Sequence, residues 1–456
     1  MNLSTVILAA GKGKRMYSET PKVLHPLAGK TLLEHVVNSS YAVNPHHQPI
    51  VVYGHEGEKV KKTLAHLNVA WVEQSQQLGT GHALLQALTH IPDDHNVLVL
   101  YGDVPLISAE TLKSFIDTTP KNSIGILTAT FPDPSGLGRI IRNKEGQITQ
   151  IIEDKDSTDA QRRIQEINSG IYILPANLLK KWLPQLQNQN AQKEYYLTDI
   201  IAMAVSENIA IHSSQPGAYE EVLGINDRVQ LAKLERQYQL RQAEKLLRQG
   251  VTLHDPARFD LRGELSVGSD VIIDINVIIE GKVQIGNHCL IGPNCVLRNV
   301  IIGDHVEIKA NSVIDGAEIA EGCSVGPFAR LRPGTVLSPR SHIGNFVEIK
   351  NSEIGTGTKV NHLTYLGDSD VGKNVNVGAG TITCNYDGIN KHRTTIGDDA
   401  FIGSNSQLVA PVTIGAGATI GAGSTITRDA PAHQLTLSRG QQRSIENWQR
   451  PKKKES

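Results

Sequence analysis

The spacing of aliphatic residues changes along the chain and predicts two parts with different folds. In the first part, aliphatic runs such as IVVY at residue 50 and VLVLYGD at residue 97 alternate with helix-like stretches at 31–43, 80–91 and 108–117. Buried strands that alternate with amphipathic helices are typical of a mostly parallel α/β sheet. We therefore predict a Rossmann-like α/β domain over residues 1–226.

A long polar helix is predicted between the two parts, over residues 227–250. The stretch has a candidate capping residue at Asp227, continues without Gly or Pro and stops at Gly250. A helix of this length spans about 33 Å at 1.5 Å per residue, and we interpret it as a stiff connector. Its apolar positions form a partial stripe that fits against either part: Val229, Leu231, Leu234, Tyr238, Ala243, Leu246 and Leu247.

After Gly250 an aliphatic residue recurs at every sixth position. One run is Ile396, Ile402, Leu408, Ile414, Ile420 and Ile426, and another is Ile319, Val325, Leu331, Leu337, Ile343 and Ile349. Five-residue steps separate several such runs. One inward aliphatic residue per hexad predicts the flat faces of a triangular prism with three hexads in each coil. Residues 251–456 are therefore predicted to form a parallel β-helix of hexapeptide repeats that ends in a C-terminal tail.

The six-residue spacing breaks once, between Val377 and Ile396. The sequence there is GAGTITCNYDGINKHRTT, which is too long for a turn and rich in Gly, Asn and Asp. It predicts an extended loop that leaves the prism, and long loops in compact repeats are usually functional or disordered.

The four cysteines make neither a Cys-x-x-Cys pair nor a dense disulfide pattern. Cys289, Cys295 and Cys323 each follow an aliphatic position by four residues, and Cys384 lies in the predicted loop. We expect reduced thiols that fill the core rather than bind metal.

Composition narrows the class of protein. The chain has 456 residues, 39% of them hydrophobic, and a formal net charge of −1, so it can bury more than one core and has no overall charge that favours nucleic acid. Its longest aliphatic runs are about five residues, against the ~20 needed to span a bilayer, and its first residues lack a cleavable signal pattern. We expect a cytoplasmic protein with neither nucleic-acid nor membrane partners.

In the stretch VILAAGKGKRM, from Val6 to Met16, an aliphatic run is followed by glycines and basic residues. A glycine loop at the carboxyl end of a buried strand lets backbone N–H groups approach an anion closely. The loop is not a Walker A motif, and Met16 stands in place of the third glycine of the dinucleotide-binding pattern. It therefore predicts a phosphate cradle of another type.

Ten short stretches follow one another in an order that is specific to a known family. They are LAAGKGKRM, PKVLH, EQSQQLGTGHA, YGDVPL, EINSGIY, RLRPG, GNFVEIK, NHLTYLGD, GAGTITCNYDG and FIGSNSQLVAPV. Together they resemble the bacterial bifunctional N-acetylglucosamine-1-phosphate uridyltransferase/glucosamine-1-phosphate N-acetyltransferases over essentially the whole chain. The resemblance implies an α/β nucleotidyltransferase domain, a left-handed β-helix and a homotrimer.

The resemblance also implies two reactions that make UDP-N-acetylglucosamine, a precursor of peptidoglycan and lipopolysaccharide. The β-helix transfers an acetyl group from acetyl-CoA to glucosamine 1-phosphate. The first domain then transfers a uridylyl group from UTP to N-acetylglucosamine 1-phosphate with Mg²⁺ and releases pyrophosphate.

In the uridyltransferase domain, the resemblance assigns the catalytic cations to Arg15 and Lys22 and the Mg²⁺ ligands to Asp103 and Asn226. An Asp after a strand also serves commonly as a cap, so the metal role of Asp103 depends on the family pattern. Lys14 stands where the family usually has Thr, and we expect a tolerated change on the solvent side. The remaining nucleotide and sugar contacts are Leu8, Ala9, Ala10, Gly11, Gln74, Gly79, Thr80, Tyr101, Gly102, Gly138, Glu153 and Asn168.

In the acetyltransferase domain, the resemblance assigns the general base to His362, and we expect Glu348 to orient its imidazole. The implied sugar-phosphate contacts are Arg332, Lys350, Tyr365 and Asn376. The implied acetyl-CoA contacts are Ala379, Asn385, Tyr386, Ser404, Ala422 and Arg439.

Two other functions are compatible with parts of the sequence. One is a sugar-1-phosphate nucleotidyltransferase whose β-helix only supports oligomerisation, and the other is a non-enzymatic solenoid scaffold that holds nucleotide as a ligand. His362 together with GAGTITCNYDG favours the bifunctional enzyme, because a purely structural β-helix needs neither a base nor a coenzyme loop.

Overall fold

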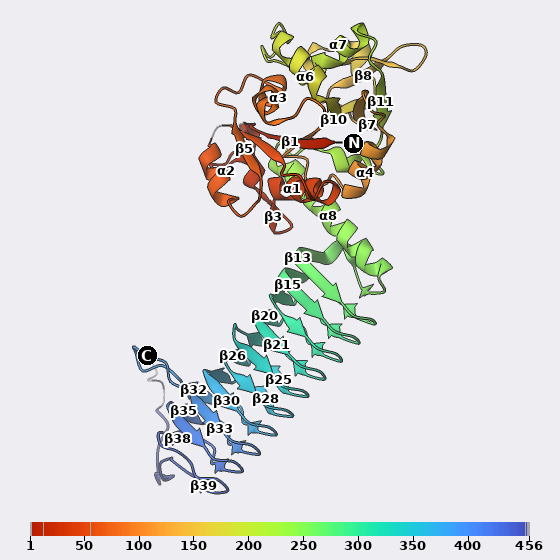
Figure 1. The fold of residues 1–456 in the computed structure, drawn as a ribbon. Helices are drawn as coiled ribbons and strands as arrows, with labels where there is room; N and C mark the ends of the chain where they lie inside the picture. The colour runs from red at the N-terminus through yellow and green to blue at the C-terminus, as the bar shows by residue number, and fades with distance from the viewer. Residues whose placement is uncertain (1, 12, 55, 452, 454–456) are drawn as a thin grey trace. The chain divides into compact units, whose positions relative to one another are not determined.

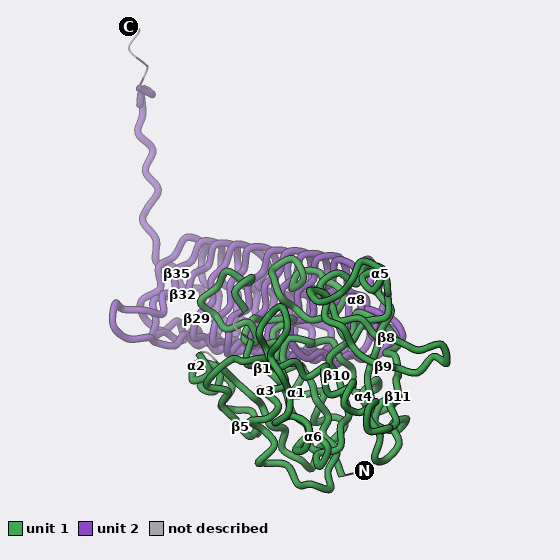
Figure 2. Tube along the Cα trace, turned by 90° about the horizontal axis from the view of Figure 1, so that it is seen from above, with its two compact units in different colours: residues 1–238 green, residues 239–456 purple. Residues whose placement is uncertain are grey.

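The chain forms two units with separate hydrophobic cores, Met1–Tyr238 and Gln239–Ser456 (Figure 2). The computed structural model describes residues 2–11, 13–54, 56–451 and 453, and Figure 1 shows their fold. The division between the units falls inside helix α8 (Arg228–Arg248).

A mostly parallel sheet runs through the first unit, which confirms the predicted fold class. The strand order is β11-β7-β10-β6-β1-β4-β5, and within this path only β10 pairs antiparallel with its neighbours. The strands are β1 (Leu3–Ala9), β4 (Ile50–Tyr53), β5 (Ala70–Glu73), β6 (Asn96–Tyr101), β7 (Ile124–Thr130), β10 (Glu166–Pro175) and β11 (Ile211–Ser214). Strands β8 (Arg139–Arg142) and β9 (Ile148–Ile152) extend it, and β2 (Pro26–Leu27) pairs with β3 (Lys30–Thr31).

Two cores cover the two faces of this sheet. Side chains alternate across a strand, so Val6 of β1 packs in one core and the adjacent Ile7 in the other, both fully buried. The predicted helices at 31–43, 80–91 and 108–117 correspond to α1 (Leu32–Val43), α3 (Thr80–Ala87) with the short η3 (Leu88–His90), and α4 (Ala109–Thr118). The others are α2 (Gly57–Thr63), α5 (Asp159–Arg162), α6 (Ala176–Trp182) and α7 (Ile200–Ser206).

The helix predicted over residues 227–250 is present as α8, and it contributes to both cores. Leu234 packs in a cluster of the first unit, with Tyr238 at its edge. Ala243 and Leu246 belong to the core of the second unit. The predicted stripe is therefore divided between the units, and its outer members Val229 and Leu247 are exposed.

The second unit is a parallel β-helix, as the six-residue spacing predicts. An eleven-stranded sheet forms one face: β12 (Thr252–Leu253), β14 (Ile272–Ile273), β16 (Leu290–Ile291), β19 (Glu307–Ile308), β22 (Ser324–Val325), β25 (His342–Asn345), β28 (Lys359–His362), β31 (Asn376–Val377), β34 (Phe401–Ile402), β37 (Thr419–Ile420) and β39 (Leu435–Thr436).

The other two faces belong to one seventeen-stranded sheet. Its strands are β13 (Phe259–Val267), β15 (Val277–Ile285), β17 (Val296–Arg298), β18 (Ile301–Ile302), β20 (Val313–Asp315), β21 (Ala317–Ile319), β23 (Arg330–Leu331), β24 (Thr335–Leu337), β26 (Glu348–Lys350), β27 (Glu353–Ile354), β29 (Tyr365–Gly367), β30 (Ser369–Val371), β32 (Ile382–Cys384), β33 (Thr394–Ile396), β35 (Gln407–Val409), β36 (Val412–Ile414) and β38 (Thr425–Ile426).

Coil length explains the five-residue steps in the sequence. Phe259 pairs with Val277 over a full coil of three hexads, whereas Ile302 pairs with Ile319 over a coil shortened by one residue. The hexad aliphatics still stack in register, and each of the two six-membered runs is fully inside the prism. Cys289, Cys295 and Cys323 are buried in the same core, so the core-filling prediction is confirmed.

The predicted loop after Val377 is shorter than expected. Residues 382–384 stay in the prism as β32, and the excursion covers 385–393, closed by a bridge between Tyr386 and Lys391. Because Ile382 remains paired with Tyr365 of the previous coil and with Gln407 of the next, the stack continues past the loop. None of the helices in the described part of the chain is long and apolar enough to cross a membrane.

The stacked aliphatics should control the stability of the β-helix. Ile354 is fully buried and pairs with Val371 and Leu337 on the adjacent coils. We expect Ile354→Ala to lower the free energy of unfolding by about 2–5 kcal/mol because it leaves a cavity, measured by denaturant unfolding of the full chain. Glu353→Ala, which changes the exposed neighbouring residue, is the matched control. An equal effect of both variants would contradict this account of the core.

Candidate active sites

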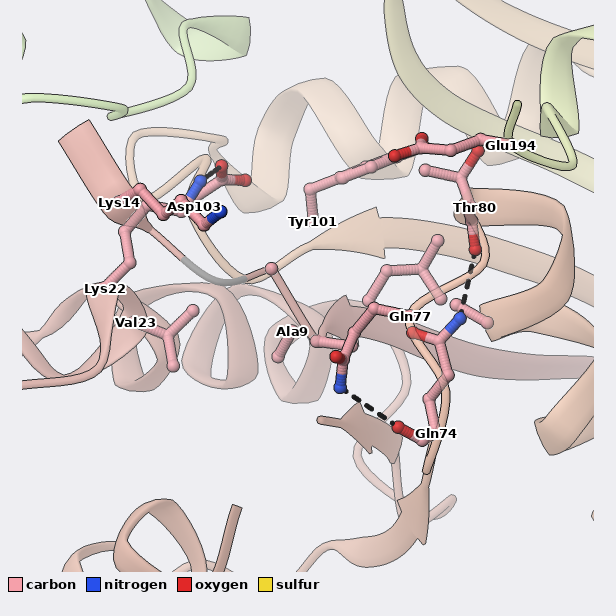
Figure 3. A pocket seen from close by; sticks show the side chains of 15 residues that line it. Ala9, Lys14, Lys22, Val23, Gln74, Gln77, Thr80, Tyr101, Asp103 and Glu194 are labelled. Atoms are coloured by element: carbon pink, nitrogen blue, oxygen red, sulfur yellow. Dashed lines mark hydrogen bonds and ion pairs between the residues drawn. The ribbon is translucent and has the colours of Figure 1, made fainter. Parts of the chain in front are cut away.

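A cavity of about 500 Å³ lies at the carboxyl ends of β1 and β6 in the first unit (Figure 3). Open α/β sheets bind their ligands at this edge. Strand ends and the loops after them supply the lining: Leu8, Ala9, Ala10, Gly11, Lys14, Lys22, Val23, Gln74, Gln77, Gly79, Thr80, Ala83, Tyr101, Asp103 and Glu194.

Most of the predicted nucleotide contacts meet at this cavity. Leu8, Ala9, Ala10, Gly11, Lys22, Gln74, Gly79, Thr80, Tyr101 and Asp103 all border it. Gly79 needs to be glycine, because its φ is +113° and a Cβ there would lie 2.7 Å from the Tyr195 carbonyl oxygen. Gly102 supports the cavity from behind, where its N–H donates to the Leu8 carbonyl at 2.9 Å.

Lys22, Asp103 and Asn226 form a compact polar cluster at one end of the cavity. The Lys22 ammonium forms an ion pair with Asp103 and lies 3.3 Å from Asn226 Oδ1. The side chains of Lys22 and Asp103 are only 11% and 18% exposed. Because both oxygens converge on one cation, the two predicted metal ligands are already arranged around a positive charge.

The two residues before Met16 are placed differently from Lys22. Arg15 lies in the short helix η1 (Lys14–Met16), is exposed and is absent from the cavity wall. Lys14 is exposed, in agreement with the solvent-side prediction, but it also borders the cavity.

Gly138, Glu153 and Asn168, the predicted sugar contacts, lie together beside β8 and β10. The Asn168 N–H donates to the Gly138 carbonyl at 2.9 Å, and a Cβ on Gly138 would lie 3.5 Å from the Glu153 carboxylate. Burial raises the pKa of Glu153, and the nearby carboxylates of Asp156 and Asp199 raise it further.

The motifs do not single out several residues of the cavity wall. Gln77 lies within EQSQQLGTGHA but resembles an ordinary loop residue, and Glu194 comes from a polar loop that precedes η6 (Leu197–Asp199). Val23 and Ala83 are core-like residues whose position at the wall depends on packing alone.

In the β-helix, His362 is exposed at the corner that follows the eleven-stranded sheet, which we call the His362 corner. Its Nδ1 lies 2.8 Å from Oδ1 of Asn345, the residue 17 positions earlier and one coil below. The expectation that Glu348 orients the imidazole is wrong. Glu348 pairs in register with Tyr365 and binds Arg332 at 2.9 Å, because a 17-residue coil stacks Asn345, not Glu348, under His362.

Four predicted coenzyme contacts continue along the His362 corner. Asn405 N–H donates to the Ala379 carbonyl at 2.7 Å, and Gly423 N–H donates to the Ser404 carbonyl at 2.8 Å. Arg439 then donates to the Ala422 carbonyl at 3.0 Å. Successive coils therefore align Ala379, Ser404 and Ala422 with His362, although the residues are far apart in the sequence.

A second polar cluster occupies the next corner, around Asp368. This buried carboxylate accepts hydrogen bonds from Asn351 and Asn385, both at 2.5 Å, and lies 3.8 Å from Lys350. Arg332 stacks one coil away from Lys350, since its N–H donates to the Ile349 carbonyl. The ammonium group of Lys350 lowers the pKa of Lys391 in the loop.

The three remaining predicted acetyltransferase residues are Tyr365, Asn376 and Tyr386. The Tyr365 hydroxyl lies beside the Asp368 cluster, since a Cβ on Gly367 would lie 2.3 Å from Tyr365 Oη and 2.7 Å from Asn385 Nδ2. Asn376 is on the eleven-stranded sheet, and Tyr386 is on the exposed loop.

The comparisons with known proteins agree with this architecture. The chain matches the family of MobA-like NTP transferase domains over residues 5–250 and bacterial transferase hexapeptide repeats over residues 393–428. Residues 261–338 also match a family described as the GMPPB C-terminal domain. Fold and sites therefore define a nucleotidyltransferase domain joined to a hexapeptide-repeat transferase domain.

Full-length relatives identify the family within this class. The chain is 54% identical over 454 residues to the bifunctional protein GlmU of Stutzerimonas stutzeri, with 100% of both chains covered. It is 55% identical over 453 residues to that of Acinetobacter baumannii, with 99% of both covered, and 55% identical over 454 residues to that of Methylococcus capsulatus, with 99% and 98% covered. The chain belongs to the family of bifunctional GlmU proteins and is a bifunctional transferase.

Burial of Glu153 should make the first unit less stable at neutral pH. A carboxyl whose folded-state pKa is raised holds its proton more tightly when folded, so stability falls as the pH rises above the unfolded-state pKa. We expect Glu153→Gln to raise the free energy of unfolding by about 1 kcal/mol at pH 7.5. Denaturant unfolding should show the difference disappear near pH 4, and a difference that persists there would contradict an effect of ionisation.

Proposed function

We propose that the chain makes UDP-N-acetylglucosamine, with acetyl transfer on the β-helix followed by uridylyl transfer in the first unit. The main support is the cluster of Lys22, Asp103 and Asn226 beside a glycine loop, at the edge of the sheet where nucleotides bind. The exposed His362, in line with the predicted coenzyme contacts, supports the second activity.

In the first unit, a phosphate oxygen of N-acetylglucosamine 1-phosphate attacks the α-phosphorus of UTP, and pyrophosphate leaves. Negative charge concentrates at the site, so positioned cations and N–H groups contribute most of the stabilisation. Lys22 supplies a largely buried ammonium, and the backbone of Ala10 and Gly11 faces the triphosphate. Arg15 approaches the pyrophosphate from the solvent side.

Asp103 and Asn226 are the proposed ligands of Mg²⁺. Mg²⁺ binds oxygen and keeps several water and phosphate ligands, so two protein oxygens suffice. The convergence of the two oxygens on the Lys22 ammonium supports the fit, since the same pair can face a hard cation. When bound, the ion neutralises phosphate charge.

On the β-helix, the amine of glucosamine 1-phosphate attacks the thioester carbonyl of acetyl-CoA, and the coenzyme thiol leaves. Asn345 Oδ1 accepts only, so the facing Nδ1 of His362 carries the ring proton. The other nitrogen, Nε2, is then free to take the proton from the amine. Asn345 is thus a positioning residue for the proposed base.

The substrate contacts divide between the two corners. Arg332 and Lys350 bind the sugar phosphate, as a planar guanidinium beside a point charge suits this anion. Ala379, Ser404, Ala422 and Arg439 follow the coenzyme along the His362 corner, with Asn385 and Tyr386 contributing from the loop. Tyr365 and Asn376 bind the sugar hydroxyls.

A homotrimer completes the proposed acetyltransferase site. Phe328 and Phe346 stack at 5.3 Å on the His362 corner and are 50% and 54% exposed, and Leu363 continues the apolar row. All three have positive φ, where most residues are strained, so the row is unusual for a solvent-facing turn. Packing between copies buries this row and brings Asn376 of one copy towards a neighbour.

The unpaired cysteines of the β-helix fit a reducing setting, and we place both reactions in the cytoplasm. A nucleotidyltransferase with a purely structural β-helix remains the second candidate. The alignment of His362 with the coenzyme corner favours the bifunctional enzyme over it.

The two activities should be separable by single substitutions. Asp103→Asn should lower pyrophosphate release from UTP at least 100-fold and leave acetyl transfer unchanged, because a metal ligand is lost in one unit only. His362→Ala should lower acetyl transfer by 10²–10⁴-fold, the usual contribution of a general base, and leave uridylyl transfer unchanged. Both rates are measured on the full chain by pyrophosphate and free-thiol assays.

Asp93→Asn and His342→Ala are the matched controls, because they change an exposed aspartate and another exposed histidine of the same units. Acetyl transfer that survives His362→Ala would favour the single-activity alternative. If the unmodified, folded chain releases no pyrophosphate from UTP, the proposed nucleotidyltransferase activity is rejected.

Phe346→Glu tests the proposed trimer. A carboxylate in a buried apolar contact is costly, so we expect monomers in sedimentation equilibrium and at least a tenfold loss of acetyl transfer, with uridylyl transfer preserved. Phe401→Glu, on a strand of the same unit, is the control. Trimers that persist with Phe346→Glu would place the interface elsewhere.

A further inference from the structure

Gln74 is a buried amide that faces the nucleotide cavity with its orientation fixed. The residue is only 2% exposed, and its Nε2 lies 3.1 Å from the Gly79 carbonyl oxygen (Figure 3). Because a carbonyl only accepts, the side-chain atom that faces it must be the NH₂ group. The carbonyl Oε1 of Gln74 has no hydrogen-bond partner among the described residues, and it points towards the cavity in Figure 3.

His82, on the first turns of α3, holds the same NH₂ group from the other side. Its Nδ1 lies 3.0 Å from Gln74 Nε2. Since that nitrogen of Gln74 donates, Nδ1 must be the unprotonated nitrogen of the imidazole. A neutral ring then carries its proton on Nε2, which lies 3.3 Å from the amide nitrogen of Gln86. The backbone of Gln76 in the same loop also bonds the ring.

We infer that neutral His82 is a positioning residue for base recognition: it fixes the amide of Gln74 so that a hydrogen-bond acceptor faces the base of the nucleotide. The inference rests on the proposed uridylyl transfer. It assigns a role to a residue that is not part of the cavity lining.

An acceptor at this position selects between pyrimidines. Uracil carries N–H at N3 and can donate to Gln74 Oε1, whereas cytosine carries a lone pair there and would face it acceptor to acceptor. Turning the amide would present NH₂ to cytosine but would set Oε1 against Gly79 O and, in the tautomer with the proton on Nε2, also against His82 Nδ1. Two acceptors thus oppose the turned amide, and removing His82 leaves only one.

Protonation of His82 should weaken this arrangement. An imidazolium has N–H at both nitrogens, so Nδ1–H would meet the NH₂ group of Gln74 donor to donor. The groups around the ring are the amides of Gln74 and Gln86 and the ring of Tyr195 at 6.5 Å, with Glu194 on the adjacent loop. Burial lowers the pKa of His82, so the effect should appear on the acid side of the usual histidine range.

The test compares UTP with CTP as substrates of the full chain, with N-acetylglucosamine 1-phosphate and Mg²⁺. His82→Leu removes the acceptor, and we expect about a tenfold higher KM for UTP, a smaller change in kcat and a lower UTP-to-CTP ratio of kcat/KM. His82→Asn keeps a side-chain acceptor near the Nδ1 position and does not titrate. It should preserve the ratio and lose the rise in KM for UTP at acid pH.

Gln86→Leu is the matched control, because Gln86 lies beside the other ring nitrogen, at 3.3 Å. It should leave base selection unchanged. An unchanged UTP-to-CTP ratio in folded His82→Leu, or an acid rise in KM that persists in His82→Asn, would overturn the role of His82. If His82→Leu does not fold, the pH profile of His82→Asn decides alone. Inactivity of the unmodified chain with UTP would instead reject the proposed uridylyl transfer.

Discussion

Parallel strand register is the constraint on which both candidate sites depend. In the first unit, parallel pairing of β1, β4, β5 and β6 brings all their carboxyl ends to one edge, where the glycine loop and Asp103 meet. In the second unit, the same pairing repeats in every coil and stacks equivalent corners above one another. A shift of one residue would turn every inward side chain outward, so the hydrophobic core fixes the register and the register positions the polar groups.

Several residues at the two sites lower the stability of the fold, and the hydrophobic cores compensate for this loss. Glu153 and Asp368 are largely buried carboxylates, and Phe328, Phe346 and Leu363 have left-handed backbone at exposed corners. Strain and buried charge of this kind concentrate at functional sites. In both units the surrounding strands are continuous and tightly packed, which allows these positions to persist.

The sequence was sufficient for the fold because its two periodicities are strong. Alternating runs predicted the α/β sheet, and the hexads predicted the prism. The glycine loop and YGDVPL were also informative, because strand ends converge in a known direction. The prediction that Glu348 orients His362 failed because spacing along the chain does not give the length of each coil. The coil length decides whether Asn345 or Glu348 lies under His362.

Other features depend on tertiary packing and have no local signal. Glu194 reaches the cavity from a loop distant in sequence, and the role of His82 follows only from which atoms face Gln74. The motif EQSQQLGTGHA contains both Gln74 and His82, but the sequence alone does not show which side-chain amide is held in one orientation. The division of helix α8 between two cores likewise required the packing of both units.

The excursion at residues 385–393 shows how such a solenoid can change its chemistry. Ser369 pairs with Thr394 directly across the insertion, so the coils before and after it stack as if it were absent. A segment that leaves at a corner and returns to the same register leaves the packing of the core unchanged. Evolution can therefore exchange or lengthen this segment without redesigning the scaffold.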